Sequence, residues 1–127
     1  MKCLLDTHAY LWWLSDPARL SHQVREVLGN RNLLVYVSVA SFWEIAIKTS
    51  LGKLSLSREV DVLETELHDD GILLLPISAM HCAGVAALPF HHRDPFDRLL
   101  VSQALKEELT LVSRDAALDA YGIVRLW

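Results

Sequence analysis

Four carboxylate side chains stand where a fold of alternating strands and helices would bring them together: Asp6, Glu44, Asp97 and Asp115. Asp6 directly follows a short apolar run, and Asp115 follows another such run by two residues. Clustered carboxylates repel one another unless a cation or protons neutralise them. Hard oxygen ligands suit Mg²⁺ or Mn²⁺ rather than zinc. The pattern therefore favours a divalent-metal site as a hypothesis.

Each of these acids also has an ordinary structural interpretation. Asp6 and Asp115 are in position to cap the helices that follow them. The segments 41–44 and 94–97 both resemble capping boxes. The acid that ends the first segment precedes Lys48 by four residues, as in a solvated ion pair worth a few tenths of a kcal/mol. Singly, each acid leaves both interpretations open, whereas the four together count against a purely structural role.

Short apolar runs alternate with helical patterns along the whole chain. The predicted strands are 3–5, 33–37, 72–76, 110–112 and 123–126. The predicted helices are 7–14, 21–29, 38–51, 58–68, 78–88, a helix that opens at Asp94-Pro95, and 116–121. Such an alternation predicts an α/β fold with a mostly parallel sheet of about five strands, covered on both faces. Ligands of open parallel sheets bind beyond the carboxyl ends of the strands, where we expect the four acids to meet.

Composition limits the class of protein. The chain has 127 residues, 52% of them hydrophobic, which suits one domain spanning 1–127. Its 16 acidic and 12 basic residues argue against coating nucleic acid by bulk positive charge, but not against a local binding site. Cys3 and Cys82 lie in apolar runs and are expected to be buried free thiols, as in a reducing cytosol. The apolar runs are far shorter than the ~20 residues of a membrane span, so we expect a cytoplasmic protein with no membrane partner.

Four segments, in order along nearly the whole chain, resemble a PIN domain, and most closely the VapC-type toxins of bacterial toxin–antitoxin pairs. They are Leu4-Leu5-Asp6-Thr7-His8, Ser41-Phe42-Trp43-Glu44-Ile45-Ala46-Ile47-Lys48, His92-Arg93-Asp94-Pro95-Phe96-Asp97-Arg98-Leu99-Leu100 and Leu111-Val112-Ser113-Arg114-Asp115. The first segment alone is a weak signal. The second and third together are a specific one.

The resemblance implies a three-layer α/β/α sandwich and an endoribonuclease that depends on Mg²⁺ or Mn²⁺. The usual four acids of the family map onto Asp6, Glu44, Asp97 and Asp115. The first three would hold one metal ion, and Asp115 would help to hold it or a second ion. A water molecule activated by the metal would then attack an RNA phosphodiester in line.

Several neighbouring side chains are candidates for supporting roles. The hydroxyls of Thr7 and Ser113 are placed to orient a carboxylate or a water molecule. Asp94 suits a helix cap better than a metal ligand. Lys48 and Arg98 flank the acids, where contacts to RNA phosphates and ordinary ion pairs remain equally open.

Two further features bear on ligands and packing. The pair His91-His92 is not expected to bind zinc, because adjacent side chains point apart and no cysteine or third histidine stands nearby. Trp43 is expected in the core, whereas one of the adjacent Trp12 and Trp13 is expected at an interface.

The expected partners are an RNA substrate, a cognate antitoxin protein and a second copy of the chain in a homodimer. The alternative function is a non-catalytic PIN-like module that binds RNA or a partner. A phosphoacceptor receiver domain is disfavoured, because Asp6 has no adjacent acid and Pro76 ends the third strand where an acceptor aspartate is needed.

Overall fold

The computed structural model describes residues 1–127 and is built on five strands. They are β1 (Lys2–Leu5), β2 (Leu34–Ser38), β3 (Leu73–Leu75), β4 (Thr110–Val112) and β5 (Arg125–Leu126). The strand order is β3-β2-β1-β4-β5, and all four pairings are parallel. The predicted α/β fold is confirmed, with a wholly parallel sheet. The last strand is shorter than predicted, because only Arg125 and Leu126 pair with β4.

The helices follow the predicted order closely. They are α1 (Thr7–Ser15), α2 (His22–Gly29), α3 (Val39–Ser50), α4 (Val60–Asp69), α5 (Ala79–Ala87) and α6 (Pro95–Lys106), with two 3₁₀ helices, η1 (Pro17–Arg19) and η2 (Ala116–Tyr121). Asp94 caps α6 and Pro95 occupies its first turn, as predicted. None of the helices combines the length and apolarity needed to span a lipid bilayer.

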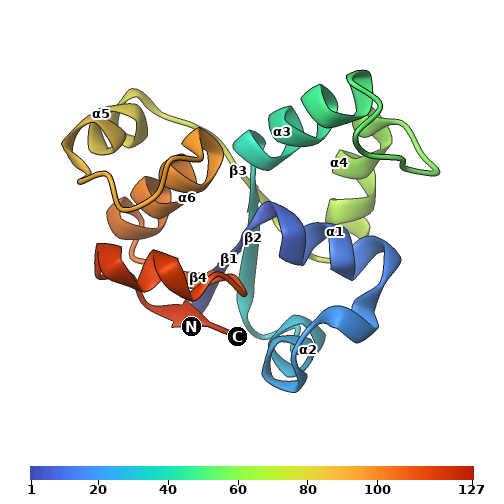
Figure 1. The fold of residues 1–127 in the computed structure, drawn as a ribbon. Helices are drawn as coiled ribbons and strands as arrows, with labels where there is room; N and C mark the ends of the chain where they lie inside the picture. The colour runs from blue at the N-terminus through green and yellow to red at the C-terminus, as the bar shows by residue number, and fades with distance from the viewer.

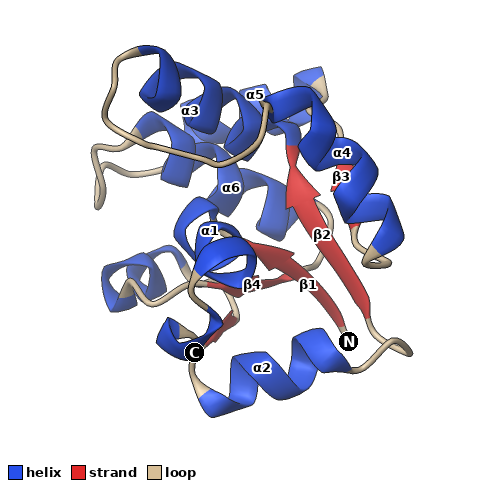
Figure 2. Cartoon of the chain, turned by 90° about the vertical axis from the view of Figure 1, so that its right-hand side faces the viewer, coloured by secondary structure: helices blue, strands red, loops and turns tan.

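Helices cover both faces of the sheet, and the alternation of side chains along β1 divides the core accordingly. Cys3 and Leu5 lie in a cluster with residues of α1, α2 and α4. Leu4 points to the other face, into a cluster with residues of α6 and η2. Figure 1 shows the sheet between these two layers, with α5 and α6 on one side and α1, α2 and α4 on the other. Figure 2 shows α3 following directly from the end of β2. The predicted three-layer sandwich is confirmed.

Two predictions about burial are wrong. Trp43 is 60% exposed rather than in the core, since it lies on the outer side of α3 and packs edge-to-face on Phe96 of α6. Cys82 is exposed rather than buried. Helix α5 packs on α6 through the side that carries His81 and Gly84, which turns Cys82 toward solvent.

Candidate metal centre

The strand order determines where the acids can meet. β1 and β4 are neighbours at the centre of the sheet, where the order along the chain reverses. Asp6 follows β1 directly, and Asp115 follows β4 by two residues. This switch point, beyond the carboxyl ends of the strands, is the usual ligand site of open parallel sheets.

Asp6 is a buried carboxylate that also caps a helix. Its Oδ1 accepts a hydrogen bond of 2.8 Å from the backbone N–H of Ala9, in the first turn of α1. Burial raises the pKa of Asp6, while the Ser113 hydroxyl and the Ala9 N–H act in the opposite direction. The negative charge of Glu44 adds to the raised pKa, so these two acids are near neighbours.

Glu44 is 3% exposed in the second turn of α3. Its Oε2 accepts a hydrogen bond of 2.6 Å from Lys48 Nζ. The predicted ion pair is therefore present, but the carboxylate is buried rather than solvated. The other oxygen, Oε1, is buried without any hydrogen-bond partner. A buried carboxylate oxygen without a partner is costly, so this atom is suited to bind a positively charged ligand.

Asp97 lies in the first turn of α6, behind the cap formed by Asp94. The Asp94 carboxylate accepts the backbone N–H groups of Phe96 and Asp97 at 2.8 and 3.3 Å, so the capping interpretation of Asp94 fits the structure. Burial raises the pKa of Asp97 to about 7, together with the charges of Asp94, Asp6 and Glu44, while His92 acts in the opposite direction. The carboxylates of Asp6, Glu44 and Asp97 therefore lie close enough to influence one another's charge.

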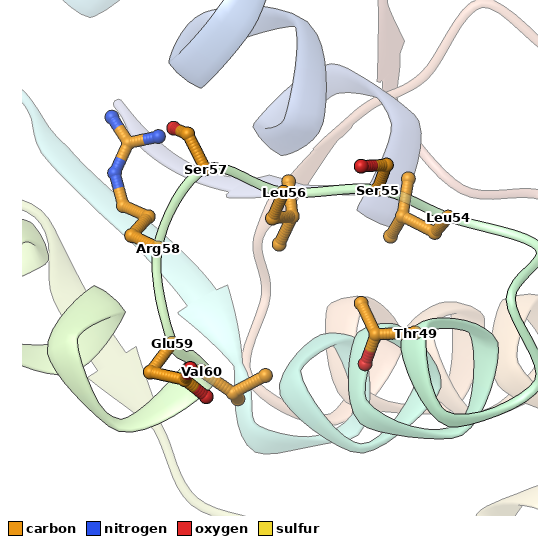
Figure 3. A pocket seen from close by; sticks show the side chains of 8 residues that line it. All are labelled: Thr49, Leu54, Ser55, Leu56, Ser57, Arg58, Glu59 and Val60. Atoms are coloured by element: carbon orange, nitrogen blue, oxygen red, sulfur yellow. The ribbon is translucent and has the colours of Figure 1, made fainter.

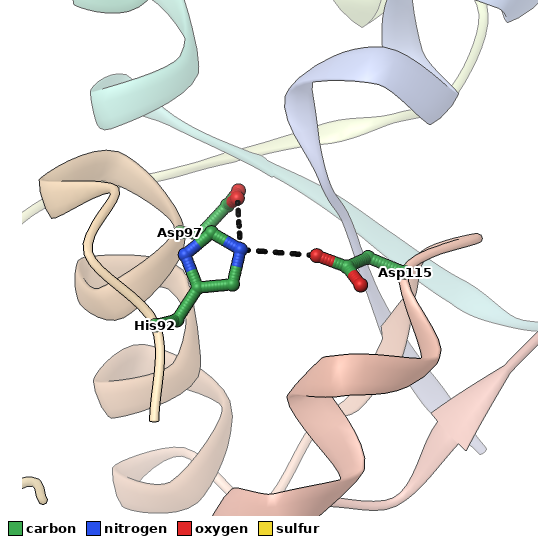
Figure 4. A group of neighbouring side chains, drawn as sticks. All are labelled: His92, Asp97 and Asp115. Carbon is green, nitrogen blue, oxygen red and sulfur yellow. Dashed lines mark hydrogen bonds and ion pairs between the residues drawn. The ribbon is translucent and has the colours of Figure 1, made fainter. Parts of the chain in front are cut away.

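Asp115 is the most open of the four acids, with 43% of its side chain exposed. Its Oδ1 accepts the backbone N–H of Ala117 at 3.0 Å and so caps η2. Its Oδ2 lies 3.0 Å from His92 Nε2, and the same nitrogen lies 3.6 Å from Asp97 Oδ2 (Figure 4). His92 thus joins α6 and η2 at the site.

Sequence reasoning missed His92. Adjacent histidines were expected to point apart, and they do: His91 packs edge-to-face against Tyr121, whereas His92 faces the acids. This divergence excludes only chelation by the pair. The available signal was the position of His92, two residues before the Asp94 cap and five before Asp97.

The two predicted hydroxyls lie beside the acids. Thr7 Oγ1 donates a hydrogen bond of 2.9 Å to Ser41 Oγ, and both residues are buried. Ser41 lies one helical turn before Glu44, so this bond ties the start of α1 to the part of α3 that carries the acid. Ser113 Oγ accepts the backbone N–H of Asp115 at 3.1 Å. Ser113 therefore contacts the segment that carries Asp115, whereas the Thr7 hydroxyl contacts another hydroxyl rather than a carboxylate.

Arg98 lies elsewhere. The residue is 5% exposed, and its guanidinium donates hydrogen bonds to the carbonyl oxygens of Pro89, Leu88 and Val85. It also donates to the Tyr121 hydroxyl at 3.0 Å. Arg98 therefore holds the loop between α5 and α6 through these hydrogen bonds. The structure gives no support for the predicted contact of Arg98 with RNA phosphates.

One pocket of the protein lies apart from the four acids. A pocket of about 370 Å³ lies between the end of α3 and the segment 54–60, as Figure 3 shows. Its lining includes Thr49, Leu56 and Arg58 but none of the four acids. Arg58 is paired there with Glu66 at 2.8 Å.

The acidic group has the donor chemistry of a divalent-cation site. Asp6, Glu44, Asp97 and Asp115 offer hard carboxylate oxygens, and the backbone cap engages only one oxygen of Asp6. The unpartnered Glu44 Oε1 and the raised pKa of Asp97 both indicate negative charge that the protein itself does not neutralise. These residues could hold a metal ion.

Comparison with known proteins shows the family of this chain. Residues 3–124 match the PIN domain family. The chain belongs to the PIN-domain family. This PIN domain is 28% identical over 119 residues to Ribonuclease VapC22 of Mycobacterium tuberculosis, covering 93% of this chain and 90% of the relative.

Solved structures share the fold of this PIN domain. VapBC2 from Rickettsia felis, bound to a DNA fragment from its promoter, is similar with a TM-score of 0.74 at 16% identity, covering 100% of this chain and 99% of the other. DNA-bound VapBC from Salmonella typhimurium is similar with a TM-score of 0.72 at 15% identity, covering 100% and 97%. The arrangement of strands and helices is thus shared with these two solved structures.

Proposed function

We propose that this PIN-domain protein is a divalent-metal-dependent endoribonuclease that acts as the toxin of a toxin–antitoxin pair. The observation that carries the proposal is the buried, unpartnered Glu44 Oε1, set among acids that raise the pKa of Asp97 to about 7. The 28% identity to a protein named as a ribonuclease, over nearly the whole chain, supports RNA as the substrate.

The metal would be held by Asp6, Glu44 and Asp97, with Asp115 completing that site or contributing to a second one. Mg²⁺ and Mn²⁺ fit this all-carboxylate donor set. When bound, such an ion polarises the phosphodiester and lowers the pKa of coordinated water.

The protein residues prepare this site before any ligand arrives. Backbone N–H groups hold one oxygen each of Asp6 and Asp115, so their carboxylates need little reorganisation. Lys48 neutralises one oxygen of Glu44 and leaves the other free. Because its pKa is about 7 without a cation, Asp97 holds a proton part of the time near neutral pH. A bound cation would replace that proton.

Exposed cations around the acids suit an RNA backbone. Arg93 and Arg114 are exposed next to Asp94 and Asp115, and Lys48 is partly exposed. Side chains of this kind position nucleic acids through their phosphates. These three cations are therefore the candidates for RNA contacts.

Protein partners belong to the same proposal. The likeness to VapBC2 and VapBC supports a cognate antitoxin and a homodimer for this chain. Trp43, exposed beside the acids, is a candidate contact residue, since aromatic side chains are enriched at interfaces.

The test is RNA cleavage by the purified chain with Mg²⁺ or Mn²⁺, and with a chelator. We expect Asp6→Asn and Asp97→Asn to slow cleavage by at least ~100-fold, since losing a ligand should exceed the 10- to 100-fold effects of outer-shell partners. Asp61→Asn, which changes an exposed acid in α4, is the matched control and should cleave normally. Metal-independent cleavage, or no cleavage by the wild-type chain, would favour the non-catalytic binding module.

A further inference from the structure

Both ring nitrogens of His92 have defined partners. Nδ1 lies 3.1 Å from the backbone nitrogen of Asp94, whose hydrogen points at it. Nε2 lies 3.0 Å from Asp115 Oδ2 and 3.6 Å from Asp97 Oδ2. In Figure 4, Nε2 faces the two carboxylates and Nδ1 faces away from them.

These contacts determine the tautomer of the ring. A backbone N–H can only donate, so the Asp94 N–H requires a lone pair on Nδ1. The Nδ1–H tautomer would place a second hydrogen in that contact. Of the two neutral tautomers, the contacts therefore select the one with its hydrogen on Nε2, which donates to Asp115 Oδ2.

We propose that His92 is a positioning residue that donates an N–H to Asp115 and does not bind the metal. The proposal rests on the function proposed above. With a hydrogen on Nε2, the nitrogen that faces the acids has no in-plane lone pair for a cation. Its N–H lies beside two carboxylates and lowers the repulsion between them. Asp115 is then held from both sides, by Ala117 on Oδ1 and by His92 on Oδ2.

The loop that carries His92 is itself fixed. The backbone N–H of His92 donates to the Tyr121 hydroxyl at 2.9 Å. Arg98 donates to the same hydroxyl at 3.0 Å and to the Pro89 carbonyl at 2.8 Å. Tyr121 belongs to η2, the helix that Asp115 caps. The ring and the carboxylate it contacts therefore share one rigid support.

Metal preference follows from this assignment. A ligating His92 would add an imidazole nitrogen and shift the site toward zinc and other transition metals. A donating His92 leaves only oxygen ligands, which favours Mg²⁺ or Mn²⁺. Because His92 does not bind the metal ion, it helps the site to prefer Mg²⁺ or Mn²⁺ over zinc.

The direct test is ¹⁵N NMR of the full chain labelled at histidine, with the His92 signals assigned by their loss in His92→Gln. We expect the Nε2–H tautomer for His92 without metal, and the same tautomer after Mg²⁺ is added. A change to Nδ1–H on adding Mg²⁺ would show that Nε2 has become a ligand and would overturn the proposal. An Nδ1–H tautomer in the metal-free chain would overturn it too. Neither NMR result depends on RNA cleavage. Failure of the nuclease assay and failure of the tautomer assignment can therefore be told apart.

A second measurement compares Mg²⁺ affinity by calorimetry in two variants. His92→Ala removes the donor and should weaken binding about 10-fold, at the lower end of outer-shell effects. His92→Gln keeps a side-chain N–H donor and should restore most of that loss. His68→Ala, at an exposed position of α4, is the control and should bind as the wild type does. Wild-type affinity in His92→Ala, or no recovery in His92→Gln, would contradict the positioning role.

Discussion

A carboxylate has two oxygens, and the acids at this site use them for different purposes. Asp6 and Asp115 each accept a backbone N–H at a helix start with one oxygen, as an ordinary cap does. The backbone cap does not engage the other oxygen of Asp6, and that of Asp115 accepts from His92. Capping and metal binding are therefore not competing interpretations of these residues, because the cap aims the carboxylate at the ligand.

At the same scale, Asp97 should make the metal-free protein sensitive to pH. Its pKa is raised from 3.8 to about 7 on folding, so the folded chain binds this proton more tightly than the unfolded chain does. The contribution of Asp97 to the free energy of unfolding should be fully present below about pH 4 and should be lost as the pH rises through about 7. The loss should be on the order of 2–4 kcal/mol.

The measurement is denaturant unfolding of the chain in chelator across this pH range. Asp97→Asn has no carboxyl to titrate, so its curve should be flatter and its stability at pH 8 greater than that of the wild type. Asp61→Asn should keep the wild-type slope, because Asp61 is exposed. An unchanged slope in Asp97→Asn would contradict the assignment of the raised pKa.

Elements bring these residues together through parallel pairing. β1 and β4 end at the same edge of the sheet, and the helices α3 and α6 pack against each other there. The Thr7–Ser41 hydrogen bond joins α1 to α3, and the edge-to-face contact of Trp43 with Phe96 joins α3 to α6. Glu44 and Asp97 each follow one of the two aromatic residues directly, so this contact also sets the spacing of the acids.

Two glycines in helices should respond to alanine with opposite signs. A Cβ at Gly84 of α5 would overlap Ser102 Oγ of α6, whose hydroxyl donates to the His81 carbonyl. Gly84→Ala should therefore destabilise the protein by about 1–3 kcal/mol. A Cβ at Gly29 of α2 meets nothing within 4 Å. Gly29→Ala should stabilise the protein by up to about 1 kcal/mol, through helix propensity.

Thermal unfolding of both variants checks this pair. Mg²⁺ affinity should not change in Gly29→Ala, because α2 lies away from the acids. Equal effects of the two substitutions would show that helix propensity alone governs both positions. The close approach of α5 to α6 would then not contribute to the free energy of unfolding.

For the whole molecule, part of the negative net charge of −4 is concentrated at one place. Four of its 16 acids gather at one edge of the sheet. Divalent ions bound there would make this region attractive to phosphate. The acidic balance of the chain is therefore compatible with an RNA substrate.

Divalent cations should stabilise the folded chain through this site. Ligands that bind only the folded state raise the free energy of unfolding, by about 2.7 kcal/mol at a concentration near 100 times Kd. For a chain of this size, that corresponds to a rise in Tm of roughly 8–12 °C. Calorimetric scans with Mg²⁺, Mn²⁺ and chelator should show the rise in the wild type and in Asp61→Asn. Asp6→Asn should lose most of it, and a full shift in that variant would place the cation elsewhere.

The sequence by itself determined the order of elements, the parallel sheet and the four candidate acids. These depend on local signals: apolar runs of strand length, helical periodicity, and caps such as Ser78, Asp94 and Asp115 within a few residues of the helix they start. Parallel connection then requires the acids that follow β1 and β4 to share one edge of the sheet.

The tertiary structure alone decided which side chains are buried and which distant residues meet. His92 and Asp115 are 23 positions apart, and their hydrogen bond depends on a loop that Arg98 and Tyr121 hold in place. Trp43 is exposed and Glu44 beside it is buried. The packing of α3 decides which of these two neighbouring side chains faces the interior of the protein. No local pattern carries that information, since it arises from contacts between surfaces that form only when the helices dock on the sheet.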